Sequence, residues 1–316
     1  MYFPYFRGRQ YELLALRELV AENLISELVV PIVEPVKLTS TFKGTLEAYT
    51  SQNRQIALIF NPEVGAFAGQ NNFLEMLSPE QTGLLPGQSE KRSVVIPALL
   101  MNSNAECVAS TLLHKNVPTE KNIVIITNRD YLESYKNLYT DTSPQYTLFP
   151  DEREFRRGIT SGKVMLKDNF RKQPKNADYP DDEFYTEDHL FYKDEGYNGF
   201  GDYSIVGNEY VEGGFAPYAV AIHIVYFAED NTLRICHFIS DSNDDISDVA
   251  GKFNEAVQKL ASWYRNGQNK QQTKAIDILL SHSDNGTYPG LPTIKKLSIM
   301  HHLELVSKYL DGNLSK

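Results

Sequence analysis

The sequence predicts an α/β fold: a (β/α)8 TIM-like barrel with a long insertion between its seventh and eighth strands, followed by a C-terminal β-hairpin and helices. Short apolar runs recur along the chain, each ends in a polar or charged residue, and segments with helical periodicity separate them. The runs are apolar on both faces, which is typical of parallel strands packed inside a barrel and covered by helices. Counting eight such runs favours a closed barrel over an open sheet.

The elements follow one another in the order that such a barrel requires. The second run is the clearest example, because Val29, Val30, Ile32 and Val33 leave no polar face. An eighth strand fits at 202–207, after a glycine-rich approach. The other predicted strands lie at 2–6, 28–34, 55–61, 93–101, 122–127, 145–149 and 162–167, and helices are predicted at 10–24, 41–52, 71–78, 104–115 and 130–138.

A long polar excursion, 168–200, separates the seventh and eighth predicted strands. Its part 178–195 combines eight acidic residues with Tyr and Phe. Loops longer than about 12–15 residues are uncommon unless they are functional or disordered. Two interpretations stay open: a lid over the barrel mouth, or a solvated surface insertion whose charges keep it in solution.

The pattern changes after residue 210. Two β-rich runs, 218–227 and 232–240, are separated by Ala-Glu-Asp-Asn and predict an antiparallel hairpin. Helices are predicted at 247–265, 270–281 and 293–310. We therefore expect two parts: a barrel at 1–210 with its insertion at 168–200, and a hairpin and helical extension at 211–316 packed on it.

Composition excludes several classes of protein. The chain has 316 residues, 41% of them hydrophobic, which is enough for a sizeable core, and its net charge of −10 argues against indiscriminate binding to DNA or anionic membranes. Two cysteines without metal-ligand spacing make a disulfide framework or a zinc site unexpected. The sequence shows no signal-like start, no membrane-spanning run, and no P-loop, GxGxxG, HExxH or GxSxG motif, so we expect a cytoplasmic protein.

Charged residues gather where the predicted strands end, and parallel barrels place their chemistry there. Arginine and lysine beside carboxylates suit an anionic substrate, because guanidinium groups bind phosphate oxygens and carboxylates hold a metal such as Mg²⁺ or act as a base. The alternative is that these charges are solvated caps and ion pairs of the rim. Glu34 stands out, because Pro31 and Pro35 stiffen the backbone around it. The candidate catalytic residues are Glu34, Asp202 and Lys167, and the candidate substrate-binding residues are Arg7, Arg9, Lys37, Asn61, Asn128, Arg129 and Asp168.

Three segments carry a resemblance to a known family. The opening YFPYFRGRQYELLALREL, then VVPIVEPV and GDYSIVG, resemble the phage and bacterial beta-protein family over roughly residues 1–210. The resemblance implies a barrel and a phage-related or phage-defence setting, in some cases beside a nuclease-like partner. It brings no established activity.

Two hypotheses for function follow. In the first, the barrel is an enzyme, such as a metal-assisted phosphoester hydrolase, that acts on a phosphate-bearing small molecule or a nucleic-acid end. In the second, it is a non-catalytic binding or assembly subunit that engages a partner protein through the aromatic and acidic insertion at 178–200 and the late hairpin. The sequence has no catalytic signature, and aromatic residues are favoured anchors at interfaces.

Overall fold

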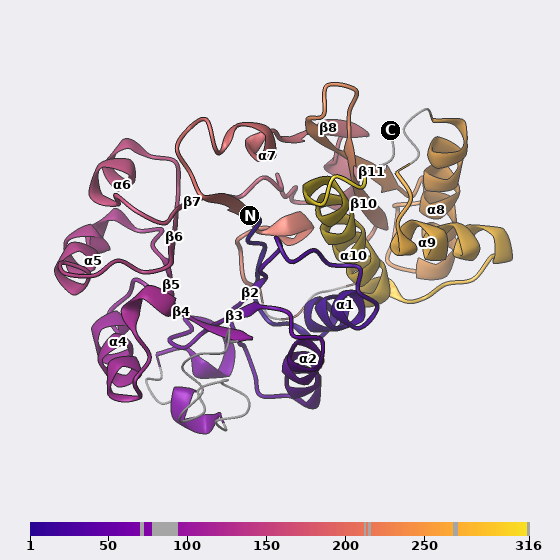
Figure 1. Ribbon diagram of the computed structural model, residues 1–316. Coiled ribbons are helices and arrows are strands. Elements are labelled where there is room, and N and C mark those ends of the chain that lie inside the picture. The colour runs from indigo at the N-terminus through magenta and orange to yellow at the C-terminus, as the bar shows by residue number, and fades with distance from the viewer. Residues whose placement is uncertain (70–72, 78–93, 212, 214–215, 268–270, 315–316) are drawn as a thin grey trace. The chain divides into compact units, whose positions relative to one another are not determined.

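The computed structural model describes residues 1–69, 73–77, 94–211, 213, 216–267 and 271–314. The chain forms two compact units, and each is assembled from separate stretches of sequence (Figure 1). The first unit contains Met1–Glu22, Glu27–Asp168 and Phe191–Tyr203, and the second contains Asn23–Ser26, Asn169–Leu190 and Ser204–Lys316.

The first unit is a nearly closed barrel of eight parallel strands, which confirms the predicted fold class. Neighbouring strands follow one another in chain order, and an isolated bridge between Tyr2 and Phe200 joins the last strand back to the start of the chain. The strands are β1 (Tyr5–Phe6), β2 (Ile32–Val33), β3 (Ile56–Ile59), β4 (Val95–Leu100), β5 (Ile123–Ile125), β6 (Tyr146–Phe149), β7 (Lys163–Lys167) and β9 (Gly199–Asp202).

The barrel interior is a packed apolar core. Alternate residues of each strand point inward, because side chains in a strand alternate between its two faces. Members of the core include Phe3, Ile32, Ile59 and Leu148, and residues between them, such as Leu58, are buried as well. Burial on both faces explains why the strands read as continuous apolar runs.

Helices surround this barrel on its outer side, as Figure 1 shows for α4, α5 and α6. The Thr39 side chain accepts a hydrogen bond from the Phe42 backbone N–H at 3.1 Å and so caps α2, which packs against α1. The described part of the predicted helix 71–78 forms a 3-10 turn, Phe73–Met76, and the rest of that prediction lies outside the described residues. The helices are α1 (Gln10–Ala21), α2 (Ser40–Ser51), α4 (Ala105–His114), α5 (Leu132–Leu138) and α6 (Arg153–Gly158).

The last barrel strand lies earlier than the prediction of 202–207. Strand β9 ends at Asp202, and the glycine-rich approach to the predicted strand is itself the strand. A Cβ atom at Gly201 would lie 2.6 Å from the Phe3 carbonyl oxygen, so the close approach of β9 to the start of the chain requires glycine. The low β propensity of glycine hid this strand from the sequence pattern.

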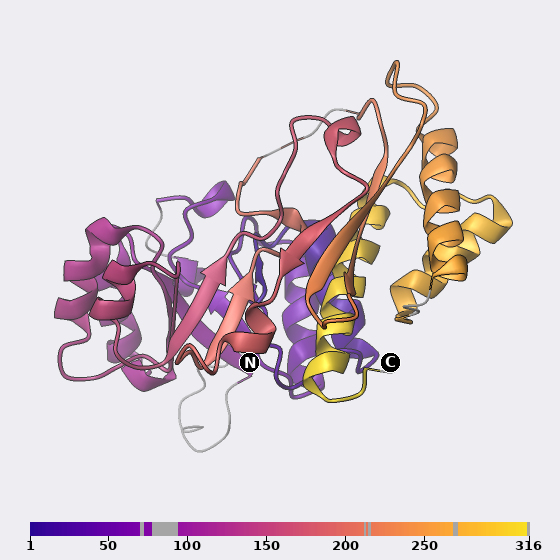
Figure 2. The same cartoon turned by 90° about the horizontal axis from the view of Figure 1, so that it is seen from above.

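The second unit contains a three-stranded antiparallel sheet and three long helices. Strands β10 (Ala221–Phe227) and β11 (Leu233–Ile239) form the predicted hairpin, and β11 also pairs with β8 (Asp182–Thr186). The helices α8 (Val249–Asn266) and α10 (Leu291–Leu310) pack on opposite faces of this sheet, because Tyr226 of β10 contacts Trp263 of α8 and the next residue, Phe227, contacts Tyr309 of α10. Helix α9 (Lys274–Asn285) packs against both helices, and Figure 2 shows the unit from above.

The acidic insertion contributes a strand to this second sheet. Strand β8 lies inside 178–195 and forms an edge of the sheet, and the short helix α7 (Asp188–Phe191) follows it. Residues 178–190 are therefore built into the second unit, whereas 191–195 belong to the first, and neither interpretation from sequence described this division. The insertion's engagement of a partner protein stays a prediction.

Among the described residues, every helix is too short or too polar to cross a membrane.

Candidate functional site

Glu34 lies directly after β2, at the carboxyl end of the strands, which forms the mouth of the barrel. Its backbone N–H donates to the Phe6 carbonyl oxygen at 2.8 Å, which continues the pairing of β1 with β2. The turn after β1 passes so closely that a Cβ atom at Gly8 would lie 2.9 Å from the Glu34 carbonyl oxygen. The Glu34 side chain is fully buried.

Three donors bind the two carboxylate oxygens of Glu34. The Tyr5 hydroxyl donates to Oε2 at 2.5 Å, and the Arg7 guanidinium donates to the same oxygen through Nη1. The Glu63 backbone N–H, in the segment after β3, donates to Oε1 at 2.7 Å. A buried carboxylate needs such partners, because burial of an unpaired charge is costly.

Arg7 lies beside the aromatic rings at the mouth. Its guanidinium carbon is 4.9 Å from the centre of the Tyr5 ring and 5.9 Å from that of Tyr203, which is the range of cation–π contacts. Nη1 of Arg7 also donates to the Tyr5 hydroxyl at 3.1 Å. The arginine side chain is 16% exposed, whereas Glu34 beneath it is closed off from solvent. The ion pair therefore presents its cation, rather than its carboxylate, to the surface.

Both tyrosine hydroxyls keep their protons at neutral pH. Burial, followed by the negative charge of Glu34, raises the pKa of Tyr5 well above its usual value. Burial raises the pKa of Tyr203 to about 12, where Arg7 opposes the shift and the Asp168 and Glu34 carboxylates add to it. The mouth thus contains neutral hydroxyl groups next to one paired cation.

Asn61 has a structural role in this arrangement. Its side-chain amide donates to the Leu100 carbonyl oxygen at 2.7 Å and accepts from the Leu100 N–H at 2.9 Å, so it continues the pairing of β3 and β4 beyond the strands. The same amide donates to the Asn102 side chain at 2.8 Å. Because both polar atoms of buried Asn61 are bound in this way, it is not presented to a ligand.

Two further candidates have partners away from Glu34. Arg9 stands at the start of α1, where its backbone N–H donates to the Glu12 carboxylate at 3.2 Å and its side chain lies 3.9 Å from the same carboxylate. Asp202 accepts a hydrogen bond from the Tyr2 hydroxyl at 2.6 Å. Tyr203, the next residue, belongs to the barrel interior, so alternation along the strand directs Asp202 to the outer face.

The remaining candidates are distributed around the rim. Lys167 is half-buried and lies opposite Asp202 where β7 pairs with β9. Asn128 accepts a hydrogen bond from the Asp130 N–H at 2.9 Å and so caps a 3-10 turn. The structure thus brings Arg7 and Glu34 into direct contact, with Asp168 close enough to act on Tyr203. Four candidates are exposed: Lys37, Asn128, Arg129 and Asp168.

The sequence pattern did not single out Tyr5 and Tyr203, although both belong to the mouth. One signal was available for Tyr5, because it precedes Arg7 by two residues and strand alternation places positions two apart on the same face. The sequence holds no such signal for Tyr203, because its neighbours depend on the pairing of β9 with the first residues of the chain.

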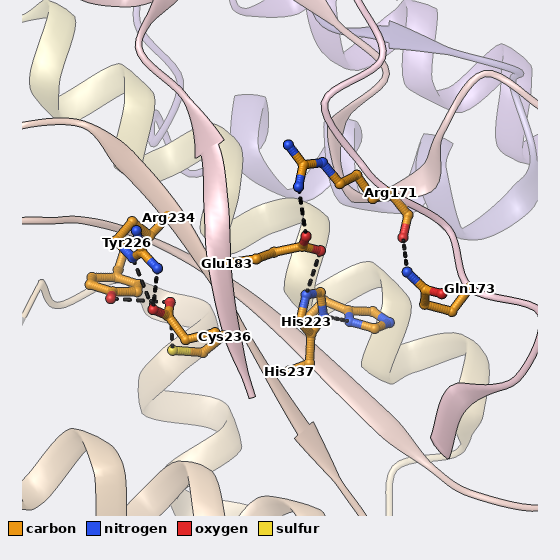
Figure 3. A network of polar contacts seen from close by, with 9 residues as sticks. Arg171, Gln173, Glu183, His223, Tyr226, Arg234, Cys236 and His237 are labelled. Atoms are coloured by element: carbon orange, nitrogen blue, oxygen red, sulfur yellow. Dashed lines mark hydrogen bonds and ion pairs between the residues drawn. The ribbon is translucent and has the colours of Figure 1, made fainter. Parts of the chain in front are cut away.

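Two histidines of the second unit also meet. His223 and His237 pair across β10 and β11, and their Nδ1 atoms are 2.7 Å apart, so one ring donates a proton to the other (Figure 3). Nε2 of His237 is 3.3 Å from Glu183, whose carboxylate also lies 3.5 Å from Arg171. Burial, followed by the charges of His237 and Lys295, lowers the pKa of His223 to about 3.

In neither unit do the described residues include a group of three or more His, Cys, Asp or Glu side chains placed to hold a metal ion. No protein-family model, no curated protein and no solved structure matches this chain. The resemblance to the beta-protein family, with the setting that it implies, therefore stays a prediction.

Proposed function

We propose that the barrel mouth binds a small phosphate-bearing ligand, such as a phosphorylated metabolite or a nucleic-acid end, with Arg7 as the contacting cation. The observation that carries the proposal is the position of the Arg7 guanidinium. Glu34 and Tyr5 hold it from below, it lies over two tyrosine rings, and it remains partly exposed where the strands end.

The chemistry of arginine supports a phosphate as the ligand. A guanidinium donates to phosphate oxygens along fixed planar directions, and the fit is best when its orientation is fixed in advance. The contacts to Nη1 supply that fixed orientation. Because Glu34 compensates the charge of Arg7, the attraction depends on geometry and hydrogen bonding more than on net charge, and we expect modest affinity.

The same contacts favour binding over a role for Glu34 in hydrolysis. Oε2 of Glu34 accepts from Tyr5 and Arg7, and Oε1 accepts from the Glu63 N–H. A general base needs an oxygen that can reach its proton, and a metal ligand needs an oxygen open to the ion. We therefore assign Glu34 the role of positioning Arg7.

The test is titration of the full chain with inorganic phosphate and with AMP, followed by calorimetry and phosphorus NMR. We expect Arg7→Lys to weaken binding about tenfold, because lysine keeps a charge beside Glu34 and loses the planar fork. The matched control is Arg54→Lys, since Arg54 precedes β3 at the opposite end of the strands and pairs with Glu27. Absence of binding to the wild-type chain, or equal affinity in Arg7→Lys, would refute the proposal.

A further inference from the structure

The second unit contains a pocket of about 490 Å³ between the sheet and α8. Its size lies in the range of sites for small molecules, about 300–1,000 Å³. Asp182 begins strand β8 and Asp181 directly precedes it; the hairpin contributes Tyr226, Cys236 and Phe238, and α8 contributes Trp263. Each of these residues belongs to the same compact unit.

Aromatic rings form one wall of this pocket. The Trp263 ring centre is 5.4 Å from that of Tyr226, with the planes at 70°, and 5.5 Å from that of Phe238, with the planes at 56°. The two strands place their rings on the same face of the sheet, because Tyr226 pairs with Arg234 and Phe238 follows four residues later in β11. The electron-rich faces of such rings attract organic cations.

The charges around the pocket leave a single negative charge without compensation. Asp182 binds the Arg234 guanidinium at 2.6 and 2.9 Å, and Figure 3 shows Arg234 together with Tyr226 and Cys236 at this point. Lys259, also at the pocket, binds the Asp241 carboxylate at 2.6 Å. These two ion pairs cancel. Asp181 is exposed, and in the described part of the chain its carboxylate has no hydrogen bond or ion pair.

The other titratable side chains of the pocket do not change this balance. Burial lowers the pKa of His237, whose Nε2 lies 3.3 Å from the Glu183 carboxylate, so its ring is uncharged at neutral pH. Burial, followed by the charge of Asp182, raises the pKa of the Cys236 thiol to about 12, so the thiol is neutral at physiological pH. The pocket therefore combines a carboxylate, Asp181, with an apolar aromatic wall and no competing uncompensated cation.

We propose that this pocket binds a small alkylammonium compound, with the ammonium group near the Asp181 carboxylate and its alkyl groups against the rings of Tyr226, Phe238 and Trp263. A methylated ammonium group fits this lining best, because its charge is spread over methyl groups that contact ring faces and do not require hydrogen-bond acceptors.

The chain supplies its own reporter for a test. Trp263 is its single tryptophan, so any change in tryptophan emission originates at the pocket wall. Titration of the full chain with choline is expected to give a saturable change in emission, and saturation-transfer NMR of the choline methyl protons provides a second readout. The uncharged isostere of choline, in which carbon replaces nitrogen, is expected to bind at least tenfold more weakly.

One substitution tests the charge of the pocket, and a second serves as its control. We expect Asp181→Asn to weaken choline binding about tenfold, because it removes the uncompensated charge and keeps the size of the side chain. Glu229→Gln, an exposed change in the hairpin turn, is the control and should leave the affinity unchanged. The proposal is overturned if choline gives no response in either readout, if the isostere binds equally well, or if Asp181→Asn binds like the wild-type chain.

Discussion

At the residue scale, Glu34 is defined by what its carboxylate accepts. Position after an apolar strand and between two prolines was enough to single it out from sequence, but the same features are compatible with a base, a metal ligand or a buried ion pair. The bonds from Tyr5, Arg7 and Glu63 support the buried ion pair, which is the role that we propose for Glu34. A carboxylate with three donors is suited to holding its neighbours in place.

This role predicts that neutralising Glu34 affects stability. We expect Glu34→Gln to lower the free energy of unfolding by about 2–3 kcal/mol, because it leaves the largely buried Arg7 cation beside an uncharged amide. Solvent reaches the exposed part of Arg7, so the loss is smaller than for a fully buried ion pair. Urea unfolding monitored by far-UV circular dichroism measures the change.

The control uses the same substitution in another ion pair. Glu27 lies 3.4 Å from Arg54 and is 69% exposed, so Glu27→Gln is expected to cost less than about 1 kcal/mol. If the two variants lose equal stability, the contacts of Glu34 do not hold the mouth together as we describe.

At the scale of elements, the turn between β1 and α1 determines where Arg7 lies in the barrel mouth. Gly8, at the centre of this turn, has a φ of 61°, and its α carbon faces the backbone after β2. This close approach of Gly8 to the backbone after β2 brings Arg7, on one side of the turn, into contact with Glu34. On the other side of the turn, α1 begins at Gln10.

We therefore expect Gly8→Ala to lower the stability of the protein by more than the cost of a left-handed backbone conformation at alanine. The backbone term is about 1–2 kcal/mol, and contact of the new methyl group with the Glu34 carbonyl oxygen at 2.9 Å should bring the total loss of stability above about 2 kcal/mol. Gly196→Ala is the comparison, because Gly196 also has a positive φ, of 80°, and its nearest neighbour would be the end of Lys163 at 3.8 Å. Similar losses in the two variants, measured by urea unfolding, would contradict the proposed close approach.

At the scale of the whole molecule, the sequence predicts local elements better than distant partners. The apolar strands and the hairpin were predictable because burial on both faces, or a short polar turn, leaves a local pattern. The fate of the acidic insertion was not, because β8 is a polar strand whose stability depends on pairing with β11, about fifty residues later. The same reason hid the pocket, whose Asp181 and Trp263 come from two separate stretches of the sequence of the second unit.

The strand-end rule found Arg7 and Glu34 for a related reason. A parallel barrel brings strand ends together whatever its loops do, so a charge at a strand end is near other charges. The rule cannot say which side chains bind one another. Asn61 and Asp202 show this limit, because their partners lie elsewhere in the barrel: Leu100 in the neighbouring strand β4, and Tyr2 in the segment before β1.

We predict that acid destabilises the second unit, because burial lowers the pKa of several of its histidines, three of them strongly. Burial, as the largest cause, lowers the pKa of His223 to about 3, of His301 to about 4 and of His302 to about 3. In the unfolded chain a histidine titrates near 6.5. Below that pH the unfolded state binds protons that the folded state excludes, so stability is fully present above pH 6.5 and falls as the pH falls toward the folded values.

Each of these histidines is expected to remove up to about 1.4 kcal/mol of stability per pH unit in that window. Urea unfolding at pH 7, 6 and 5, monitored by the emission of Trp263, follows the second unit, because the single tryptophan lies in α8. His302→Gln should reduce the slope by about one proton, since it removes a titrating group that bonds the Ser204 hydroxyl through Nδ1 at 2.9 Å. His114→Gln, at an exposed site of α4 in the first unit, should leave the slope unchanged.

A stability that stays constant from pH 7 to pH 5 would contradict this prediction. It would mean that His223, His301 and His302 bind protons in the folded state, and so that the second unit opens to water more readily than its packing indicates.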